Sequence, residues 1–232
     1  MMKQDNLEII KEGKTGHGIL IENDGYMFIK NPQTINEEFR NGEWNVPYPF
    51  IVDAVFQKYG IKNANGRIYP EAILKRQVEL YQQKIDERRA LGEENHPQES
   101  TIDLGRIAIN IIELHWEGAT LVGKLEINTS YGFRKYGIVT TRGDDVANLI
   151  LNGYKIGVSS RGVGSVEQKL GQYIVGDDFE LICWDVVSDP STPGAYIGKP
   201  EELQQYVESN TSNSGKNSIN EKISKIKNIL NS

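Results

Sequence analysis

Ser159 lies in the segment whose residue types and spacing best suit covalent chemistry. Residues 154–161 alternate in polarity and predict a strand, because successive side chains of a strand point to opposite faces. One face is mostly apolar and is expected to meet the core: Tyr154, Ile156, Val158 and Ser160. The other face places a hydroxyl and a glycine between two cations: Lys155, Gly157, Ser159 and Arg161. A serine there can be a nucleophile with open space and positive charge beside it, although serines at strand ends more often bond nearby backbone.

A serine attacks a carbonyl only when a base takes its proton. Three histidines are available. His96 lies in a polar loop, Gly92 to Pro97, between an expected helix and an expected strand, where a rigid scaffold often holds catalytic groups. His17 lies in a glycine-rich N-terminal stretch, and His115 lies at the end of a strand. Spacing alone favours reading His96 as an ordinary surface histidine.

A third group usually orients the base. In the strand expected over residues 179–188, Asp185 shares its face with Phe179, Leu181, Cys183 and Val187. A carboxylate on an apolar row is costly to bury unless it is paired. A register shift of one residue would instead leave Asp185 in water, and the pattern favours neither reading. The runners-up lie nearer to turns: Asp177, Asp178, Glu180 and Asp189.

Composition sets limits on the function. The chain has 232 residues, 25% of them charged, and a formal net charge of −6. This acidic balance argues against a general nucleic-acid-binding protein, which would show a basic surface. The sequence begins without the apolar run of a secretory signal, and no apolar run is long enough to cross a bilayer. With one cysteine, Cys183, and three dispersed histidines, it has no zinc-ligand spacing, and we expect no metal and no cofactor.

The elements around these residues predict one main domain over residues 46–208. Residues 1–45 are polar and broken by glycines, so we expect a loosely ordered segment with at most one hairpin. Residues 209–218 are rich in Ser, Asn and Gly, a flexible linker by composition. Residues 219–232 place Ile219, Ile223, Ile226 and Leu230 on one face of a short amphipathic helix.

Within the main domain, periodicity predicts two helices among several strands. A helix from Pro70 to about Ala90 would bury a stripe of Leu74, Val78, Tyr81 and Ile85. A second would cover residues 142–151, just after Thr141. Strands are expected over residues 47–57, 105–114, 120–127, 171–175 and 179–188, besides the segment of Ser159.

Three blocks together resemble the prohead (procapsid maturation) serine proteases of tailed bacteriophages. They are Asn65-Gly66-Arg67-Ile68-Tyr69-Pro70 with the later Leu91-Gly92-Glu93-Glu94-Asn95-His96-Pro97, then Gly157-Val158-Ser159-Ser160-Arg161-Gly162-Val163-Gly164-Ser165, and Trp184-Asp185-Val186-Val187-Ser188-Asp189-Pro190-Ser191. The likeness covers about residues 45–200, in order and at similar intervals. The pairing of the Gly-Glu-x-Asn-His-Pro block with the Val-Ser-Ser-Arg-Gly block is its most specific part.

This resemblance implies a serine endopeptidase related in fold to herpesvirus assemblin. We therefore expect an α+β, β-rich domain, a mixed and partly closed β-barrel with flanking helices. Carried over by position, Ser159 would be the nucleophile and His96 the general base. The third member varies among relatives, and Asp185 is our own assignment for it. Strand parity separately favours Ser159 over Ser160, because Gly157 on the same face leaves room for His96 and substrate.

The resemblance also implies cleavage after glutamate. Lys155, Gly157 and Arg161 would then line the substrate site, with the two cations pairing with the substrate carboxylate, although each cation taken singly is more simply a surface charge. Backbone N–H groups of Thr192 and Gly194 are candidates for the oxyanion hole. Self-cleavage is expected in the chain ends at the triplets Ile10-Lys11-Glu12, Leu20-Ile21-Glu22, Ile35-Asn36-Glu37 and Ile219-Asn220-Glu221.

The expected substrates are the scaffold, or core, and major capsid proteins, cut inside an assembling prohead in the host cytoplasm. A homo-oligomer is compatible with this reading; nucleic acid and membrane partners are not expected. Two alternatives stay open. One is a non-catalytic scaffold or structural head protein of the same fold, and the other is a related endopeptidase with a cellular substrate. The presence of both His96 and Ser159 speaks against the first.

Overall fold

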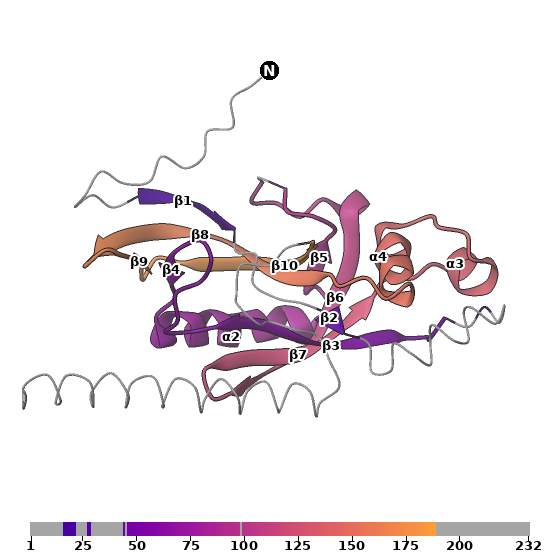
Figure 1. Ribbon diagram of the computed structural model, residues 1–232, viewed down its shortest axis with the longest axis horizontal. Coiled ribbons are helices and arrows are strands. Elements are labelled where there is room, and N and C mark those ends of the chain that lie inside the picture. Colours follow the sequence, from indigo (N-terminus) through magenta and orange to yellow (C-terminus); the bar gives the residue numbers. More distant parts are fainter. Residues whose placement is uncertain (1–15, 22–26, 29–43, 45, 98, 189–232) are drawn as a thin grey trace, which may run out of the picture.

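The computed structural model describes residues 16–21, 27–28, 44, 46–97 and 99–188. These residues form two five-stranded sheets with helices packed beside them (Figure 1). The expected β-rich α+β class is therefore confirmed. Within the described ranges, no helix is both long enough and apolar enough to cross a membrane.

The first sheet is built around β8, Gly157–Lys169, which pairs antiparallel with β1, β9 and β10. The other members are β1 (Gly16–Ile21), β9 (Gln172–Val175), β10 (Glu180–Val187) and β4 (Arg67–Ile68), which joins β9 in parallel. The strand expected over residues 154–161 is displaced toward the C-terminus. It starts at Gly157, so Lys155 precedes the strand instead of flanking Ser159 on it.

The second sheet has the order β2-β3-β7-β6-β5 and is antiparallel throughout. Its strands are β2 (Met27–Phe28), β3 (Phe50–Lys58), β5 (Leu91–Glu93), β6 (Ile107–Glu117) and β7 (Thr120–Ile127). Three of them correspond to the strands expected over residues 47–57, 105–114 and 120–127. The expected polar loop from Gly92 to Pro97 is wrong for its first two residues. Gly92 and Glu93 belong to β5 and pair with β6 at the edge of the sheet.

Helix α2, Glu71–Asp86, confirms the first predicted helix and its buried stripe, although it ends earlier than expected and Pro70 is its N-cap. Helix α4, Arg142–Leu151, begins and ends where expected, and a capping box between Thr141 and Asp144 fixes its start. Two short elements are not predicted by periodicity: α3 (Tyr131–Tyr136) and the 3-10 turn η1 (Leu104–Arg106). Figure 1 shows α3 and α4 together at the opposite end of the molecule from β4 and β9.

The core between the sheets is organised around Trp184 of β10. Its ring meets Tyr81 of α2 edge to face at a centroid distance of 5.0 Å, and Phe56 of β3 at 5.4 Å. All three side chains are at most 2% exposed. Aromatic pairs of this geometry add to the stability gained by burying their area. α2 thus links β10 of the first sheet to the face of the second.

The expected partly closed barrel is not found among the described residues. The two sheets remain separate ladders that pack on each other, and among the described residues an isolated parallel bridge between Glu94, just after β5, and Val186 of β10 joins their backbones. There the backbone N–H of Asn95 donates to the carbonyl of Val186 at 2.8 Å. A likeness to the assemblin barrel is accordingly not confirmed.

The N-terminal segment also differs from expectation where it is described. β1 pairs with β8 and β2 pairs with β3, so these two strands join different sheets and do not form a hairpin with each other. The predicted linker and amphipathic helix, residues 209–218 and 219–232, lie outside the described residues.

Candidate active site

Ser159 and Asp185 come from neighbouring strands of the first sheet. They are direct partners in the antiparallel ladder of β8 and β10, so their side chains leave the sheet on the same face. His96 comes from the other sheet, three residues after the end of β5. The bridge between Glu94 and Val186 brings that segment against β10. The structure thus brings the three predicted residues together from two sheets.

A chain of hydrogen bonds links these three side chains. Nδ1 of His96 lies 2.8 Å from Oδ2 of Asp185, and Nε2 lies within hydrogen-bonding distance of Oγ of Ser159. Because a carboxylate only accepts, Nδ1 carries the ring proton and Nε2 is left as the acceptor. Such an arrangement can move a proton from the hydroxyl to the imidazole.

Asp185 is fully buried and paired, which resolves the choice left open by the sequence pattern. Its Oδ1 accepts a hydrogen bond from the backbone N–H of Glu93 at 2.9 Å. Its Oδ2 lies 3.0 Å from Nε of Arg161. These contacts supply the compensation that a buried carboxylate requires.

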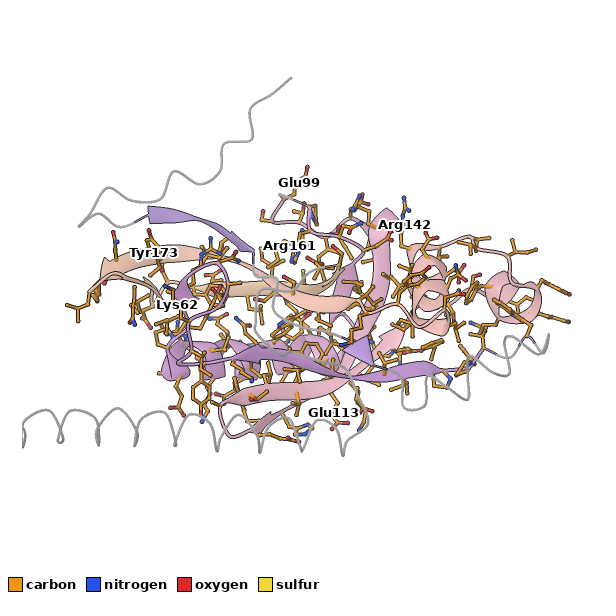
Figure 2. The ribbon with its side chains drawn as sticks, viewed as in Figure 1. Lys62, Glu99, Glu113, Arg142, Arg161 and Tyr173 are labelled. Carbon is orange, nitrogen blue, oxygen red and sulfur yellow. The ribbon has the colours of Figure 1, made fainter. Side chains whose placement is uncertain are left out.

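Arg161 does not present its charge to a substrate as expected. Its side chain is 0% exposed, and the guanidinium pairs with Asp185 and with Oε1 of Glu93, the latter at 2.9 Å. It also donates to the carbonyl of Glu99 at 2.7 Å, so that it lies beneath the loop carrying that residue (Figure 2). The alternation correctly placed Arg161 on the face of Ser159. That face, however, is covered at this position by the segment that follows His96.

The remaining candidates divide by location. Lys155 is exposed and Gly157 is buried, and a role for either in substrate binding stays a prediction. Thr192 and Gly194 lie outside the described residues. Ser160 points away from the site, and its buried Oγ has no hydrogen-bond partner.

The alternative bases and acids are engaged elsewhere. The His115 ring lies 3.3 Å from Glu113 on β6. Asp177 pairs with Arg76 of α2 at 2.7 Å, and Asp178 accepts a hydrogen bond from the Ser165 backbone. The side chain of His17 is not among those described.

Glu93 is the component of the site that sequence reasoning missed. It was read as part of a polar loop, yet its side chain is 0% exposed and contacts Arg161. Its neighbour Gly92 makes this placement possible: a Cβ there would lie 2.1 Å from the carbonyl oxygen of Trp184. Only glycine permits so close an approach of β5 to β10, and this approach delivers the Glu93 N–H to Asp185.

Cys183 completes the surroundings of Asp185. Its Sγ lies 3.3 Å from Oδ1 of Asp185. Burial, and after it the charge of Asp185, raises the pKa of this thiol well above its usual range. The sole cysteine is therefore a protonated thiol at neutral pH and has no nucleophilic character.

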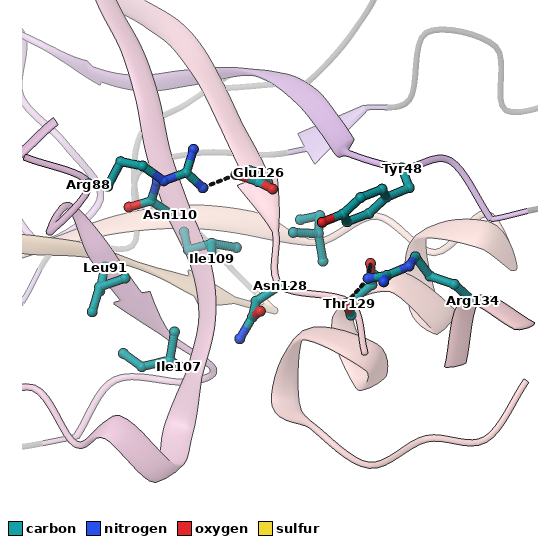
Figure 3. A pocket seen from close by; sticks show the side chains of 11 residues that line it. Tyr48, Arg88, Leu91, Ile107, Ile109, Asn110, Glu126, Asn128, Thr129 and Arg134 are labelled. Atoms are coloured by element: carbon teal, nitrogen blue, oxygen red, sulfur yellow. Dashed lines mark hydrogen bonds and ion pairs between the residues drawn. The ribbon is translucent and has the colours of Figure 1, made fainter. Parts of the chain in front are cut away.

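A separate pocket of about 310 Å³ lies over β6 and β7 (Figure 3). Arg88 and Glu126 pair at 2.9 Å on one side of it, and Arg134 contacts Thr129 on the other. Ser159, His96 and Asp185 are not among its lining residues. The described cavity and the hydrogen-bonded triad are thus different places on the molecule.

Comparison with known proteins gives consistent matches. A family model described as prohead core protein serine protease matches residues 28–211. The prohead core protein protease of Enterobacteria phage T4 is 34% identical over 167 residues, which cover 69% of this chain and 74% of that protein. The solved structure of the bacteriophage T4 capsid assembly protease, gp21, aligns with a TM-score of 0.56 and 26% identity, over 78% of this chain and 97% of that one.

Proposed function

The chain belongs to the prohead core protein serine protease family, and from this premise we propose that it is a serine endopeptidase with Ser159 as nucleophile. His96 is the general base and Asp185 the residue that orients it. The observation that carries the proposal is the continuous hydrogen-bond chain from Ser159 Oγ through both His96 nitrogens to Asp185. The side chain of His96 is only 8% exposed, unlike that of a solvated surface histidine.

The proposed reaction follows from this geometry. Oγ of Ser159 attacks the scissile carbonyl carbon while Nε2 of His96 takes the hydroxyl proton. The imidazolium then gives that proton to the leaving amine as the peptide C–N bond breaks, and an acyl-enzyme remains on Oγ. A water molecule, deprotonated by the same nitrogen, hydrolyses the ester. Asp185 stays ionised throughout and stabilises the imidazolium through its bond to Nδ1.

The substrates are proposed from the relatives. The solved neighbour is a capsid assembly protease, and the curated relative is a prohead core protein protease. We infer that this chain cuts scaffold and capsid proteins inside an assembling prohead, after glutamate, and that it also cuts its own ends. Because Ser159 is 0% exposed, a substrate reaches Oγ only after part of the surrounding chain moves.

The decisive experiment joins activity to the assigned nucleophile. Purified protein is incubated with a glutamate-containing reporter peptide and, separately, with a fluorophosphonate probe that labels activated serines. We expect wild-type protein to cleave the peptide after glutamate and to carry the probe on Ser159. The Ser159→Ala variant should do neither, and its intact mass should exceed that of self-cleaved wild type.

Two outcomes would contradict the proposal. Equal cleavage by Ser159→Ala would remove Ser159 as the nucleophile. Wild-type protein that stays uncut and unlabelled, even when co-assembled with scaffold and capsid proteins, would favour the non-catalytic head protein instead.

A further inference from the structure

A buried ion cluster lies directly behind the triad. Arg161 pairs with Asp185 at 3.0 Å and with Glu93 at 2.9 Å, and all three side chains are 0% exposed. Arg106 adds a second cation, with Nε 3.4 Å from Oε2 of Glu93. Two carboxylates thus face two guanidinium groups, and the formal charge of the cluster is zero.

The cluster fixes the orientation of the Asp185 carboxylate. Oδ1 faces the Glu93 N–H and one guanidinium nitrogen of Arg161, at 2.9 Å and 3.3 Å. Oδ2 faces His96 and Nε of Arg161. With both oxygens engaged on different sides, the carboxylate cannot rotate without breaking a buried contact. Its alignment with Nδ1 of His96 is therefore set by groups that do not touch the reacting atoms.

Arg161 also holds the segment that carries the base. Besides Asp185 and Glu93, it donates to the carbonyl of Glu99, three residues beyond His96. Glu93 reaches the same segment from its other end, because its Oε1 accepts from the Asp103 backbone N–H at 2.9 Å. The Arg161–Glu93 pair thus ties the loop of His96 to the strands of Ser159 and Asp185.

We propose that Glu93 and Arg161 are positioning residues for the triad, which hold Asp185 in place and balance the charge that His96 experiences. This inference rests on the proposed function, since it assigns a role within that site. It replaces the expectation that Arg161 pairs with the carboxylate of the substrate glutamate. Both side chains are 0% exposed, so they act through Asp185 and through the loop of His96.

Because Glu93 and Arg161 carry opposite charges, removing one or the other should have opposite effects on the protonation of His96. Removing the carboxylate of Glu93 leaves an extra positive charge behind Asp185, which disfavours a protonated His96. Removing the guanidinium of Arg161 leaves an extra negative charge, which favours a protonated His96. The other titratable and charged groups around the site remain the same in both variants: Arg106 from η1, Cys183 from β10, Tyr81 from α2, and Glu94 with its partner Arg142 from α4.

The test follows the ring resonances of His96 by NMR as pH is varied, in a Ser159→Ala background that cannot cut itself. We expect Glu93→Gln to lower the titration midpoint by about one pH unit, and Arg161→Gln to raise it by a similar amount. The Glu93→Gln/Arg161→Gln double variant restores a neutral cluster and should titrate near the parent midpoint. Arg88→Gln, which removes an exposed cation paired with Glu126, is the control and should not shift it.

Activity provides the second readout, in chains that retain Ser159. Arg161→Lys keeps the charge but loses the planar fork, so we expect its kcat to fall at least tenfold with an unchanged pH profile. Shifts of the same sign in both single variants, or none, would overturn the inference. If a single variant does not fold, the double variant and Arg161→Lys test the inference instead. A double variant whose His96 titration midpoint differs from the parent's by a full pH unit would also overturn the inference. Because NMR needs no catalysis, a failure of the proposed function would show separately, as absent proteolysis in wild type.

Discussion

Asp185 and Ser159 stand directly opposite each other in the antiparallel ladder of β8 and β10. Their side chains share one face, and the imidazole of His96 spans the gap between them. Since a slip of one residue would turn every side chain of a strand to the other face, the register of this single ladder decides whether Asp185 and Ser159 share a face. The bulge between Leu181 and Cys183 lies just before this pair.

Asp185→Asn should abolish most activity while leaving the fold intact. The asparagine oxygen would stay on the Glu93 N–H, so its NH2 would face Nδ1 of His96. Because an NH2 group donates, the ring proton would move to Nε2, which could then no longer accept the serine proton, and we expect kcat to drop by roughly 10⁴-fold. Peptide cleavage at saturating substrate measures this. Asp185→Ala should in addition lower the free energy of unfolding by about 3 kcal/mol, because Arg161 then loses a buried ion-pair partner. Near wild-type turnover in Asp185→Asn would contradict the role of Asp185.

Ser160→Ala should be nearly silent in catalysis and neutral or stabilising in folding. The Oγ of Ser160 is buried without a hydrogen-bond partner, and removing an unsatisfied polar atom relieves a desolvation cost of about 1 kcal/mol. We would measure cleavage of the reporter peptide and urea unfolding for both Ser159→Ala and Ser160→Ala. A Ser160→Ala protein as inactive as Ser159→Ala would contradict the assignment of Ser159 alone to the face of β8 that meets His96.

Gly92→Ala should damage stability and activity together. A methyl group there would meet the Trp184 carbonyl at 2.1 Å and the Ile109 side chain, so β5 must move away from β10. We expect a loss of about 3 kcal/mol together with weakened cleavage, because the Glu93 N–H moves away from Asp185. Gly118→Ala is the matched control: its φ is +59° but nothing lies within 4 Å of its Cβ. It should cost only about 1 kcal/mol from backbone strain and leave cleavage unchanged.

Asp144 should make stability depend on pH in the acid range. Burial alone would raise its pKa, but hydrogen bonds from the backbone and hydroxyl of Ser130 and the backbones of Thr140 and Thr141 hold that pKa below the usual 3.8. Near and below that pH the unfolded chain binds more protons, so the contribution of Asp144 is present above about pH 4 and is lost on acidification. Urea unfolding of Ser159→Ala protein with and without Asp144→Asn should show a difference of about 2 kcal/mol at pH 7 that narrows toward pH 3. A constant difference would contradict this.

Cys183 should resist alkylation in the native protein. The thiol is 0% exposed and its pKa is raised by burial and by Asp185. Iodoacetamide at pH 8 should leave native protein unlabelled and active, whereas protein in 6 M guanidinium should take up one label, which mass spectrometry counts. Rapid loss of activity with labelling of the native protein would place the thiol in the reaction.

Local sequence patterns predicted the longer helices and strands, because these elements are locally determined, but not how the strands pair into two sheets. The stripe of α2, the capping box of α4 and the alternation of β8 each depend on residues close together in the chain. β5 escaped prediction because three residues carry no periodicity, and its position depends on the contact of Gly92 with Trp184.

The sequence predicted the three residues that the hydrogen-bond chain joins, but it did not predict the buried ion pairs behind them. Alternation assigned Ser159 and Arg161 to one face, and the apolar row of β10 raised the question of a buried Asp185. A face does not reveal what covers it, however. The carboxylate that pairs with the buried Arg161 belongs to Glu93, which lies 68 positions away in the sequence, and no local pattern connects the two.

The junction between the sheets has one more consequence. Ser159 and Asp185 belong to the first sheet, while His96 follows β5 of the second, and the bridge of Glu94 with Val186 joins the backbones of the two sheets. Sliding one sheet past the other by a single residue step, about 3.3 Å, would carry the imidazole out of reach of Oγ and leave every ladder within each sheet intact. The folding of each sheet and the assembly of the three-residue hydrogen-bond chain are therefore separable, because a small shear at that junction would break the contact of His96 with Ser159 without unpairing the strands within either sheet.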